Sequence, residues 1–369
     1  MAPAVEAPRP SFGIEGSRLR DFEGSKFIPI NLAVLNRATI AIAIAVCLCG
    51  CSQPRGASER APIRIAVGSQ TDMVYLPTTL AQQLGYYEQE GLRVAIVDTA
   101  AGAKALEALL GGSADVVTGF YDHAIQMAAD GKSIKAFVSM VRYPGAVAIL
   151  SPEAAQRIHS VEDLKGATAG VTSPGSSSHF FLNFLLRKHG LSPADVSVVG
   201  TGGGASRVMA IERNKVAVGV LYEPGVTQLL HRSSSARILA DTRTGEGVQQ
   251  IYGVPNYPSA VLYSNGAWLK ENPDTARRLA RAMQRTLKWI QEHSAEQIME
   301  RMPASFRGDA PALYLEALQH SLPMYSPDGV MRPEGAEAVR KVLAVSIDKV
   351  RTAKFDLAET YTNEFIQSK

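Results

Sequence analysis

Cysteine is nearly absent from this chain of 369 residues, which contains only three. All three, Cys47, Cys49 and Cys51, lie in one short stretch near the amino terminus. The rest of the chain therefore needs no disulfide, and it offers neither a thiol nucleophile nor a thiolate metal site. We predict no metal and no cofactor.

The chain also lacks a large excess of charge of one sign, and it lacks long apolar runs. The chain has 38 Lys and Arg against 35 Asp and Glu, a formal net charge of +3 spread along its length. It has no basic stripe, which a nucleic-acid partner would require, and no apolar run long enough for a membrane-spanning helix. With 46% hydrophobic residues, the chain is globular and large enough for two domains.

A shorter apolar segment, residues 38–48, follows Arg37 and has the length of a signal-peptide core. It ends in Leu48-Cys49-Gly50-Cys51, which resembles the bacterial lipoprotein signal, in which the last cysteine is lipidated and becomes the new amino terminus. That signal usually has a small residue where Cys49 stands, so a plain secretory signal is the alternative.

We expect residues 1–50 to be an N-terminal extension and lipoprotein signal peptide, and residues 51–61 a tether. Residues 1–30 are long and polar for such a signal, so we expect translation to start further along the chain. A lipid on Cys51 would hold the body on a membrane, in the periplasm or at the cell exterior.

Short apolar runs alternate with helical patterns from residue 63 onward. We expect strands at residues 63–67, 92–97, 116–119, 134–141, 147–150, 167–171, 196–200, 216–221, 238–240 and 260–263. Helical patterns separate most of them and dominate after residue 273. This alternation predicts parallel sheets with right-handed crossovers, in which ligands gather at the carboxyl ends of the strands.

The stretch from Ala167 to Leu186 contains the most specific candidate for a site. A buried strand is followed by the turn Ser173-Pro174-Gly175 and then by a helix whose first residues are Ser176, Ser177 and Ser178. Free N–H groups, the helix dipole and three hydroxyls would together bind a small oxyanion. The alternative is that these serines only cap the helix.

Other candidates follow strands in the same way. Aromatic residues among them either enclose a ring or alkyl chain of the ligand or fill the core. Glu223 either accepts from an amine or ring N–H, or is an acid at a helix start before Pro224. Tyr143 is either a cleft wall or a hinge residue. These candidates are Gln70, Asp72, Tyr75, Phe120, Tyr121, Tyr143, Tyr222 and Glu223.

Two arginines and a histidine near these positions stay outside the predicted site. Arg142 and Arg207 could each pair an anion, but most arginines lie on solvated faces, and we expect the same of these two. His179 could contact a ligand, but we expect it at the surface or in a helix cap. The glycine loop 200–205 lacks the Gly-Lys-Ser/Thr ending of a phosphate-binding loop and the spacing of a dinucleotide fingerprint.

Several short sequence motifs occur one after another in this chain. They include Gly85-Tyr-Tyr-Glu-Gln-Glu-Gly-Leu92, Leu109-Leu-Gly-Gly-Ser-Ala-Asp115, Val161-Glu-Asp-Leu-Lys-Gly-Ala167 and Val218-Gly-Val-Leu-Tyr-Glu-Pro224. Together they resemble the substrate-binding proteins of bacterial importers for nitrate, alkanesulfonates, taurine and thiamine-pyrimidine precursors. The resemblance implies the two-lobed α/β periplasmic-binding-protein fold of type II. Lobe one would comprise residues 62–143 and 258–369, and lobe two residues 144–257.

The same resemblance implies a function. The protein would be a monomeric solute-binding lipoprotein that closes on a small organic anion, resembling a sulfonate, taurine or nitrate, and delivers it to an ABC permease and ATPase. It would not be an enzyme. The alternatives are a binding protein for a thiamine-related pyrimidine precursor, a sensor, or an enzyme on this fold. The fungal pyrimidine-precursor synthase has such a fold, but its cysteine-rich motif is missing here.

Overall fold

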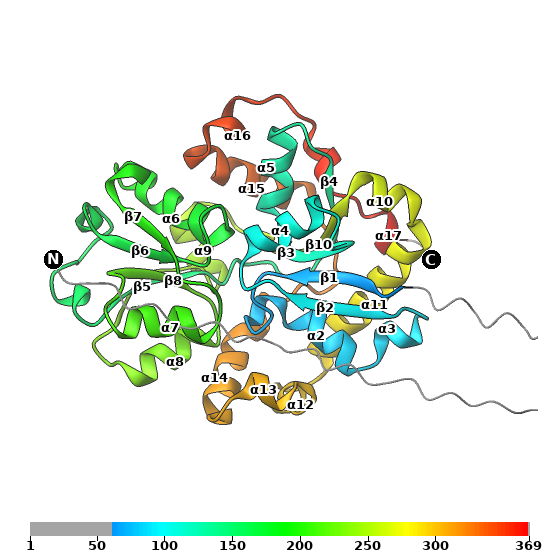
Figure 1. Ribbon diagram of the computed structural model, residues 1–369, viewed down its shortest axis with the longest axis horizontal. Coiled ribbons are helices and arrows are strands. Elements are labelled where there is room, and N and C mark those ends of the chain that lie inside the picture. Colours follow the sequence, from blue (N-terminus) through cyan, green and yellow to red (C-terminus); the bar gives the residue numbers. More distant parts are fainter. Residues whose placement is uncertain (1–60, 368–369) are drawn as a thin grey trace, which may run out of the picture. The chain divides into compact units, whose positions relative to one another are not determined.

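The computed structural model describes residues 61–367 (Figure 1). The predicted signal peptide, most of the tether and Cys51 lie outside these residues. Among the described residues, none of the helices is both long enough and apolar enough to cross a membrane.

The first sheet is built around strands from the beginning of the described chain. Its strands are β1 (Ile63–Val67), β2 (Val94–Asp98), β3 (Val116–Phe120), β4 (Ile134–Ser139) and β10 (Ala260–Asn265), in the spatial order β2-β1-β3-β10-β4. β1 is parallel to β2 and β3, whereas β10 is antiparallel to both of its neighbours. Every residue of β3 is buried, as expected for a central strand covered on both faces.

The second sheet has the same design. Its strands are β5 (Val147–Leu150), β6 (Thr168–Val171), β7 (Ser197–Gly200), β8 (Val218–Leu221) and β9 (Arg237–Asp241), in the order β7-β6-β8-β5-β9. Here β5 is antiparallel to β8 and β9. In each sheet the reversed strand is the first one after the chain arrives from the other sheet. The predicted two-lobed α/β fold is confirmed, with mixed sheets.

Helices cover both sheets. Around the first sheet these are α2 (Leu76–Gln83), α3 (Tyr86–Gln89), α4 (Gly102–Leu110), α5 (Asp122–Ala129), α10 (Gly266–Glu271), α11 (Pro273–Glu292), α15 (Pro333–Ser346), α16 (Asp348–Thr352) and α17 (Glu364–Gln367). Around the second they are α6 (Ser177–Lys188), α7 (Ala205–Glu212), α8 (Gly225–Arg232) and α9 (Gly245–Tyr252). The segment α12 (Ala295–Arg301), α13 (Ala304–Arg307) and α14 (Pro311–Ser321) follows α11, and α14 lies beside α8 (Figure 1).

The sequence explains these helices locally. Pro273 opens α11 at a position where its missing N–H costs nothing, and Leu279, Met283 and Leu287 then repeat at helical spacing on the buried face. Short 3₁₀ turns link the other elements. They are η1 (Met73–Tyr75), η2 (Ala154–Gln156), η3 (Glu162–Leu164), η4 (Pro193–Asp195), η5 (Leu322–Met324) and η6 (Leu357–Thr360).

Two crossing segments, residues 140–146 and 242–259, connect the sheets. They run side by side, because Thr242 N donates to Ala146 O at 3.0 Å and Tyr257 N donates to Arg142 O at 3.0 Å. Paired crossings of this kind can act as a hinge. We call the part built on the first sheet, with the segment after β10, the first lobe and the part built on the second sheet the second lobe; the predicted boundaries at residues 143 and 258 stay predictions.

Candidate functional site

The loops at the carboxyl ends of the strands meet where the lobes face each other. After β1, Met73 N donates to the carbonyl oxygen of Glu223, which follows β8, at 2.8 Å. In α4, Ala103 N donates to Ser176 Oγ at 3.0 Å. Strand-end loops of both lobes therefore form one contiguous surface, as expected for α/β sheets.

An ion pair that is fully buried joins the lobes. Arg207 of α7 donates through Nη2 to both carboxylate oxygens of Asp72, each at 2.9 Å, and both side chains are nearly inaccessible to solvent. Burial raises the pKa of Asp72, while the charge and hydrogen bond of Arg207 oppose that rise. The guanidinium also lies over the ring of Tyr222, 5.2 Å from its centroid.

Three aromatic rings continue from this ion pair into the interface. Tyr75 meets Phe120 edge-on with 6.0 Å between ring centroids, and Phe120 meets Tyr222 in the same way at 5.7 Å. All three are at most 5% exposed. The row links the two lobes, since Tyr75 and Phe120 belong to the first and Tyr222 to the second. Aromatic faces and edges of this kind suit a planar or alkyl ligand body.

The three predicted serines have different partners. Ser176 accepts from Ala103 N of the first lobe, and Ser177 Oγ donates to Asp122 of the first lobe at 2.8 Å. Ser178 instead accepts from Thr172 N at 3.0 Å and thereby fixes the turn before α6. We call the turn at residues 173–175 with Ser176, Ser177 and Ser178 the serine corner. It faces the first lobe, but the group that lies against it there is the carboxyl group of Asp122 and not a cation.

Asp122 is the buried acid at this corner. Burial raises its pKa to about 7, although the hydrogen bond from Ser177 lowers it in part. A carboxyl group in this position accepts hydrogen bonds when ionised and repels an oxyanion nearby. The serine corner is therefore better suited to a ligand N–H or O–H than to a sulfonate.

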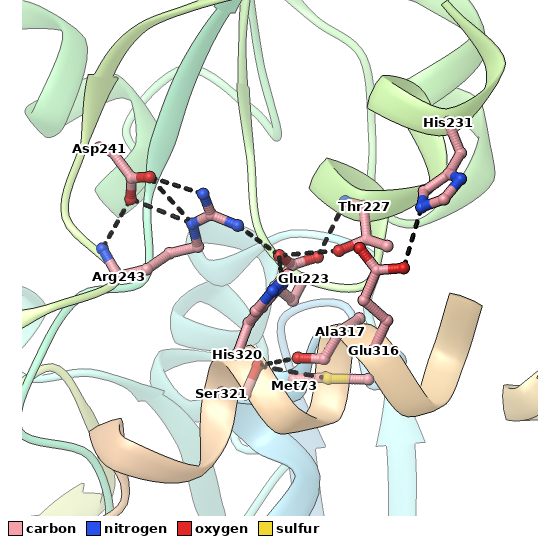
Figure 2. Close-up of polar contacts among 10 residues, drawn as sticks. All are labelled: Met73, Glu223, Thr227, His231, Asp241, Arg243, Glu316, Ala317, His320 and Ser321. Atoms are coloured by element: carbon pink, nitrogen blue, oxygen red, sulfur yellow. Dashed lines mark hydrogen bonds and ion pairs between the residues drawn. The ribbon is translucent and has the colours of Figure 1, made fainter. Parts of the chain in front are cut away.

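Glu223 is the centre of a second charged network (Figure 2). Its carboxylate accepts from Thr227 N at 3.0 Å and lies 2.7 Å from Arg243 Nη1 and 3.7 Å from His320 Nδ1 of α14. Arg243 is also bound to Asp241, with Nη2 at 2.7 Å. Burial would lower the pKa of Arg243, but these two carboxylates raise it overall.

A second His–Glu contact crosses from the second lobe to α14. His231 Nε2 of α8 lies 2.9 Å from Glu316 Oε2 (Figure 2). Both side chains are largely exposed, so this contact adds little energy compared with the buried Glu223 network.

Close approach of the lobes depends on a glycine. A Cβ atom on Gly203, in the loop before α7, would lie only 2.4 Å from Ser69 Oγ and 2.6 Å from Ser69 Cβ. Ser69 itself has φ of 92°, a left-handed conformation that is strained for serine. The glycine loop at residues 200–205 therefore allows close contact between the lobes, which agrees with its lack of a phosphate-binding motif.

Three predicted residues have their contacts outside the aromatic row and the networks of Asp72, Asp122 and Glu223. Gln70 Nε2 donates to Thr79 Oγ1 at 2.9 Å. Tyr121 is bonded through its hydroxyl to Thr360 and lies edge-on to Tyr361, two residues near the carboxyl end of the described chain. Tyr143 lies on the first crossing segment, with the Arg142 guanidinium 5.3 Å from its ring centroid. Whether any of the predicted residues contacts a solute stays a prediction.

The expectation that Arg207 is solvated is wrong, since it is 1% exposed and bound to Asp72. Arg243 and His320 were not singled out from the sequence. The sequence does not show the partners of these cations in the fold, because Asp72 lies 135 residues from Arg207 and Glu223 lies 20 residues from Arg243. His179 does cap locally, since its Nδ1 accepts from Gly175 N at 3.1 Å.

Metal-binding groups do not gather in the described residues. Among residues 61–367, no group of three or more His, Cys, Asp and Glu side chains has an arrangement that could hold a metal ion. The side chains that meet between the lobes are aromatic rings, buried carboxyl groups and arginines.

Two mixed sheets in this strand order, paired crossings and strand-end loops meeting between lobes define the periplasmic-binding-protein fold. The chain belongs to the NMT1/THI5-like family, which it matches over residues 73–297, more than half its length. The family expected from the motifs is thus confirmed.

Solved structures and a curated relative agree with this assignment. A structure from Bordetella bronchiseptica RB50 is 37% identical with a TM-score of 0.79, covering 84% of this chain and 96% of that one. The alkanesulfonate-binding protein SsuA from Xanthomonas axonopodis pv. citri, bound to MOPS, is 20% identical with a TM-score of 0.65, covering 83% and 99%.

One of the curated relatives is an enzyme by name. The 4-amino-5-hydroxymethyl-2-methylpyrimidine phosphate synthase of Schizosaccharomyces pombe (strain 972 / ATCC 24843) is 29% identical over 130 residues, 35% of this chain and 36% of that protein. The similar proteins thus include both a binding protein and a synthase.

Proposed function

We propose that this protein is the solute-binding component of an ABC importer and that it captures a small organic anion between its lobes, without chemical change. The observation that carries the proposal is the set of buried aromatic and charged side chains, from strand-end loops of both lobes, that meet across the lobe boundary. Such a surface can be completed only when the lobes close, so a solute that contacts both lobes favours the closed state by its differential affinity.

The proposal includes location and partners. The lipoprotein-like signal supports export and a lipid anchor on Cys51. A permease and its ATPase would then receive the solute from the closed protein, which acts as a monomer. Radiolabelled lipid incorporation that is lost in Cys51→Ala would support the anchor, and co-purification with a permease and ATPase rather than a kinase would separate transport from sensing.

A second candidate solute is a pyrimidine, and a specific observation favours it. Asp122 and Glu223 are buried acceptors that closely follow Phe120 and Tyr222 of the aromatic row in the chain, and an aminopyrimidine presents a flat ring with N–H donors. The pyrimidine phosphate synthase among the relatives adds support. In this case the carboxyls would bind the ring, and an anionic group would not be required.

A thermal-shift screen separates these candidates. The panel contains alkanesulfonates, taurine, nitrate, carboxylates and aminopyrimidines at constant ionic strength, because a ligand at a hundredfold its Kd adds about 2.7 kcal/mol of stability. We expect organic anions to raise Tm by several degrees. A rise with pyrimidines alone would replace the first candidate by the second, and turnover of a bound compound would contradict a pure binding role.

A further inference from the structure

A cavity of about 280 Å³ lies beside the Asp72–Arg207 ion pair, between the second lobe and the segment that contains α13. The starts of α7 and α8 form one wall, and residues 305–310 form the other. Three arginines line it, namely Arg207, Arg232 and Arg307. Of the predicted site residues, Asp72 lines this cavity, whereas none of the three arginines was among them.

Arg207 has donors left for a second partner. Both of its hydrogen bonds come from one nitrogen, Nη2, and both go to Asp72. Its Nε and Nη1 are buried and have no hydrogen-bond partner in the described part of the chain. Buried charged donors without acceptors are costly, so an acceptor in the adjoining cavity would relieve that cost once a small movement of the wall uncovers them.

Arg307 repeats this pattern on the opposite wall. Its Nε is also buried without a partner among residues 61–367. Arg232 is more exposed and lies only loosely near Glu212, at 4.0 Å, so its guanidinium can turn toward the cavity. Asp72 and Arg207 neutralise each other, so the excess positive charge of the cavity comes from Arg232 and Arg307, with Asp309 exposed at the rim.

The adjacent backbone favours the same charge. α7 and α8 each have eight residues, and both begin at this cavity, at Ala205 and Gly225. The first N–H groups of a helix and its dipole attract anions. Guanidinium groups bind carboxylate, sulfonate and phosphate oxygens through two parallel hydrogen bonds.

We propose that the oxyanion group of the solute binds in this cavity, to Arg207, Arg232 and Arg307, and not at the serine corner of α6. The inference rests on the proposed function and sharpens it: the solute is a small organic oxyanion whose acidic head lies under α13 while its body lies toward the aromatic row. Asp122 then faces the body of the solute, where a carboxyl group does not oppose binding.

The test compares charge variants with a neutral isostere. Binding of ethanesulfonate, propionate and methyl phosphate is measured by calorimetry at fixed ionic strength, with ethyl methyl sulfone as the uncharged match of the sulfonate. The variants are Arg307→Gln, Arg232→Gln, and Ser177→Ala with Ser178→Ala; Arg351→Gln, an exposed arginine of α16, is the matched control. Each variant is first shown to unfold cooperatively.

We expect Arg307→Gln to weaken anion binding at least tenfold and Arg232→Gln about threefold. The serine variant and Arg351→Gln should bind the anions with the affinity of the unaltered protein. The affinity for the uncharged sulfone should be the same in all variants. Normal affinity in the arginine variants with loss in the serine variant would overturn the inference and leave the proposed function intact. Binding of aminopyrimidines, measured in the same way, without binding of any anion would overturn the inference and replace the organic anion by a pyrimidine as the proposed solute. If no anion or pyrimidine binds the unaltered protein, the proposed function falls as well.

Discussion

Asp122 links a single side chain to the pH range in which the protein is most stable. It lies at the start of α5, is 2% exposed, and accepts from Ser177 of the other lobe. Burial, not a neighbouring charge, is the main cause of its raised pKa. Ionisation of Asp122 at neutral pH therefore lowers the stability of the folded protein, at the place where Asp122 contacts Ser177 of the other lobe.

The Asp122→Asn substitution tests this cost. The folded pKa of about 7 is above the ordinary value of 3.8, so the folded protein binds the proton more tightly and its stability falls as pH rises from about 4 through 7. Asn keeps an acceptor for Ser177 without the charge. Because one pKa unit corresponds to about 1.4 kcal/mol, we expect the gain in stability from Asn to be about 2–3 kcal/mol larger at pH 8 than at pH 5. Equal pH dependence of the two proteins would contradict the assignment.

Gly203 decides how closely the lobes approach. Because a Cβ there would lie 2.4 Å from Ser69 Oγ, Gly203→Ala should hinder closure and weaken solute binding roughly tenfold, with little change in Tm of the solute-free protein. Ser69→Gly removes the obstructing side chain and also suits the φ of 92° at that residue. The double variant should therefore recover most of the affinity. Calorimetry that finds Gly203→Ala unimpaired would show that this contact is not part of the closed state.

At the scale of elements, the network around Glu223 joins three separate parts of the chain. The loop after β8 supplies the carboxylate, the segment after β9 supplies Arg243, and α14 supplies His320 (Figure 2). A buried carboxylate is stable only while its cations are present. The network thus holds α14 of the first lobe against the second lobe.

A double-mutant cycle measures this network. Arg243→Met leaves Glu223 buried beside only Thr227 and His320, and we expect a loss of about 3 kcal/mol in the free energy of unfolding by urea. Adding Glu223→Gln removes the orphaned charge and should restore at least half of the loss. His231→Gln is the control, because its pairing with Glu316 is exposed, and it should change stability by less than about 0.5 kcal/mol. Additive effects of Arg243→Met and Glu223→Gln would contradict a coupled pair.

The elements also show which parts of the fold the sequence predicts. Runs such as Val147–Leu150 and the amphipathic face of α11 carry their structure in local spacing, and both agree with the expectation. The reversed direction of β5 and β10 does not follow from their composition, because a buried apolar strand has the same pattern in either direction. α9, capped by Thr244, was not expected in the second crossing, where glycines at 245 and 247 weaken the helical pattern.

In the candidate site, too, some features follow from the local sequence and others only from the fold. Strand-end positions such as Asp72 and Glu223 follow from the general geometry of parallel strands, so the sequence predicts them as candidates. Arg207 could not be predicted, since only the fold brings it to Asp72 from the other lobe. For Tyr121 the sequence indicates a position after β3 but not which way the ring points, and its hydroxyl is bound to Thr360 instead.

At the scale of the whole molecule, the contacts between lobes are of two kinds: ion pairs and hydrogen bonds, and apolar packing that includes the aromatic row. The apolar clusters contain residues of both lobes, for example Phe180 and Phe184 of α6 with Val117 of β3. The ion pairs and hydrogen bonds can be exchanged for water when the lobes separate, whereas the apolar contacts favour the closed arrangement. Hinge opening at the paired crossings would expose Asp72, Tyr222 and the arginine cavity together. The closed arrangement is then the one that a bound solute stabilises.

The most direct test is the distance between the lobes with and without solute. Spin labels are placed at Leu110 of α4 and Val199 of β7, two exposed apolar positions in different lobes, with Cys47, Cys49 and Cys51 replaced by serine. We predict a broad distance distribution in the solute-free protein that becomes shorter and narrow when the stabilising anion from the thermal screen is saturating. A distribution that does not change on saturation would contradict capture of a solute by closure of the lobes.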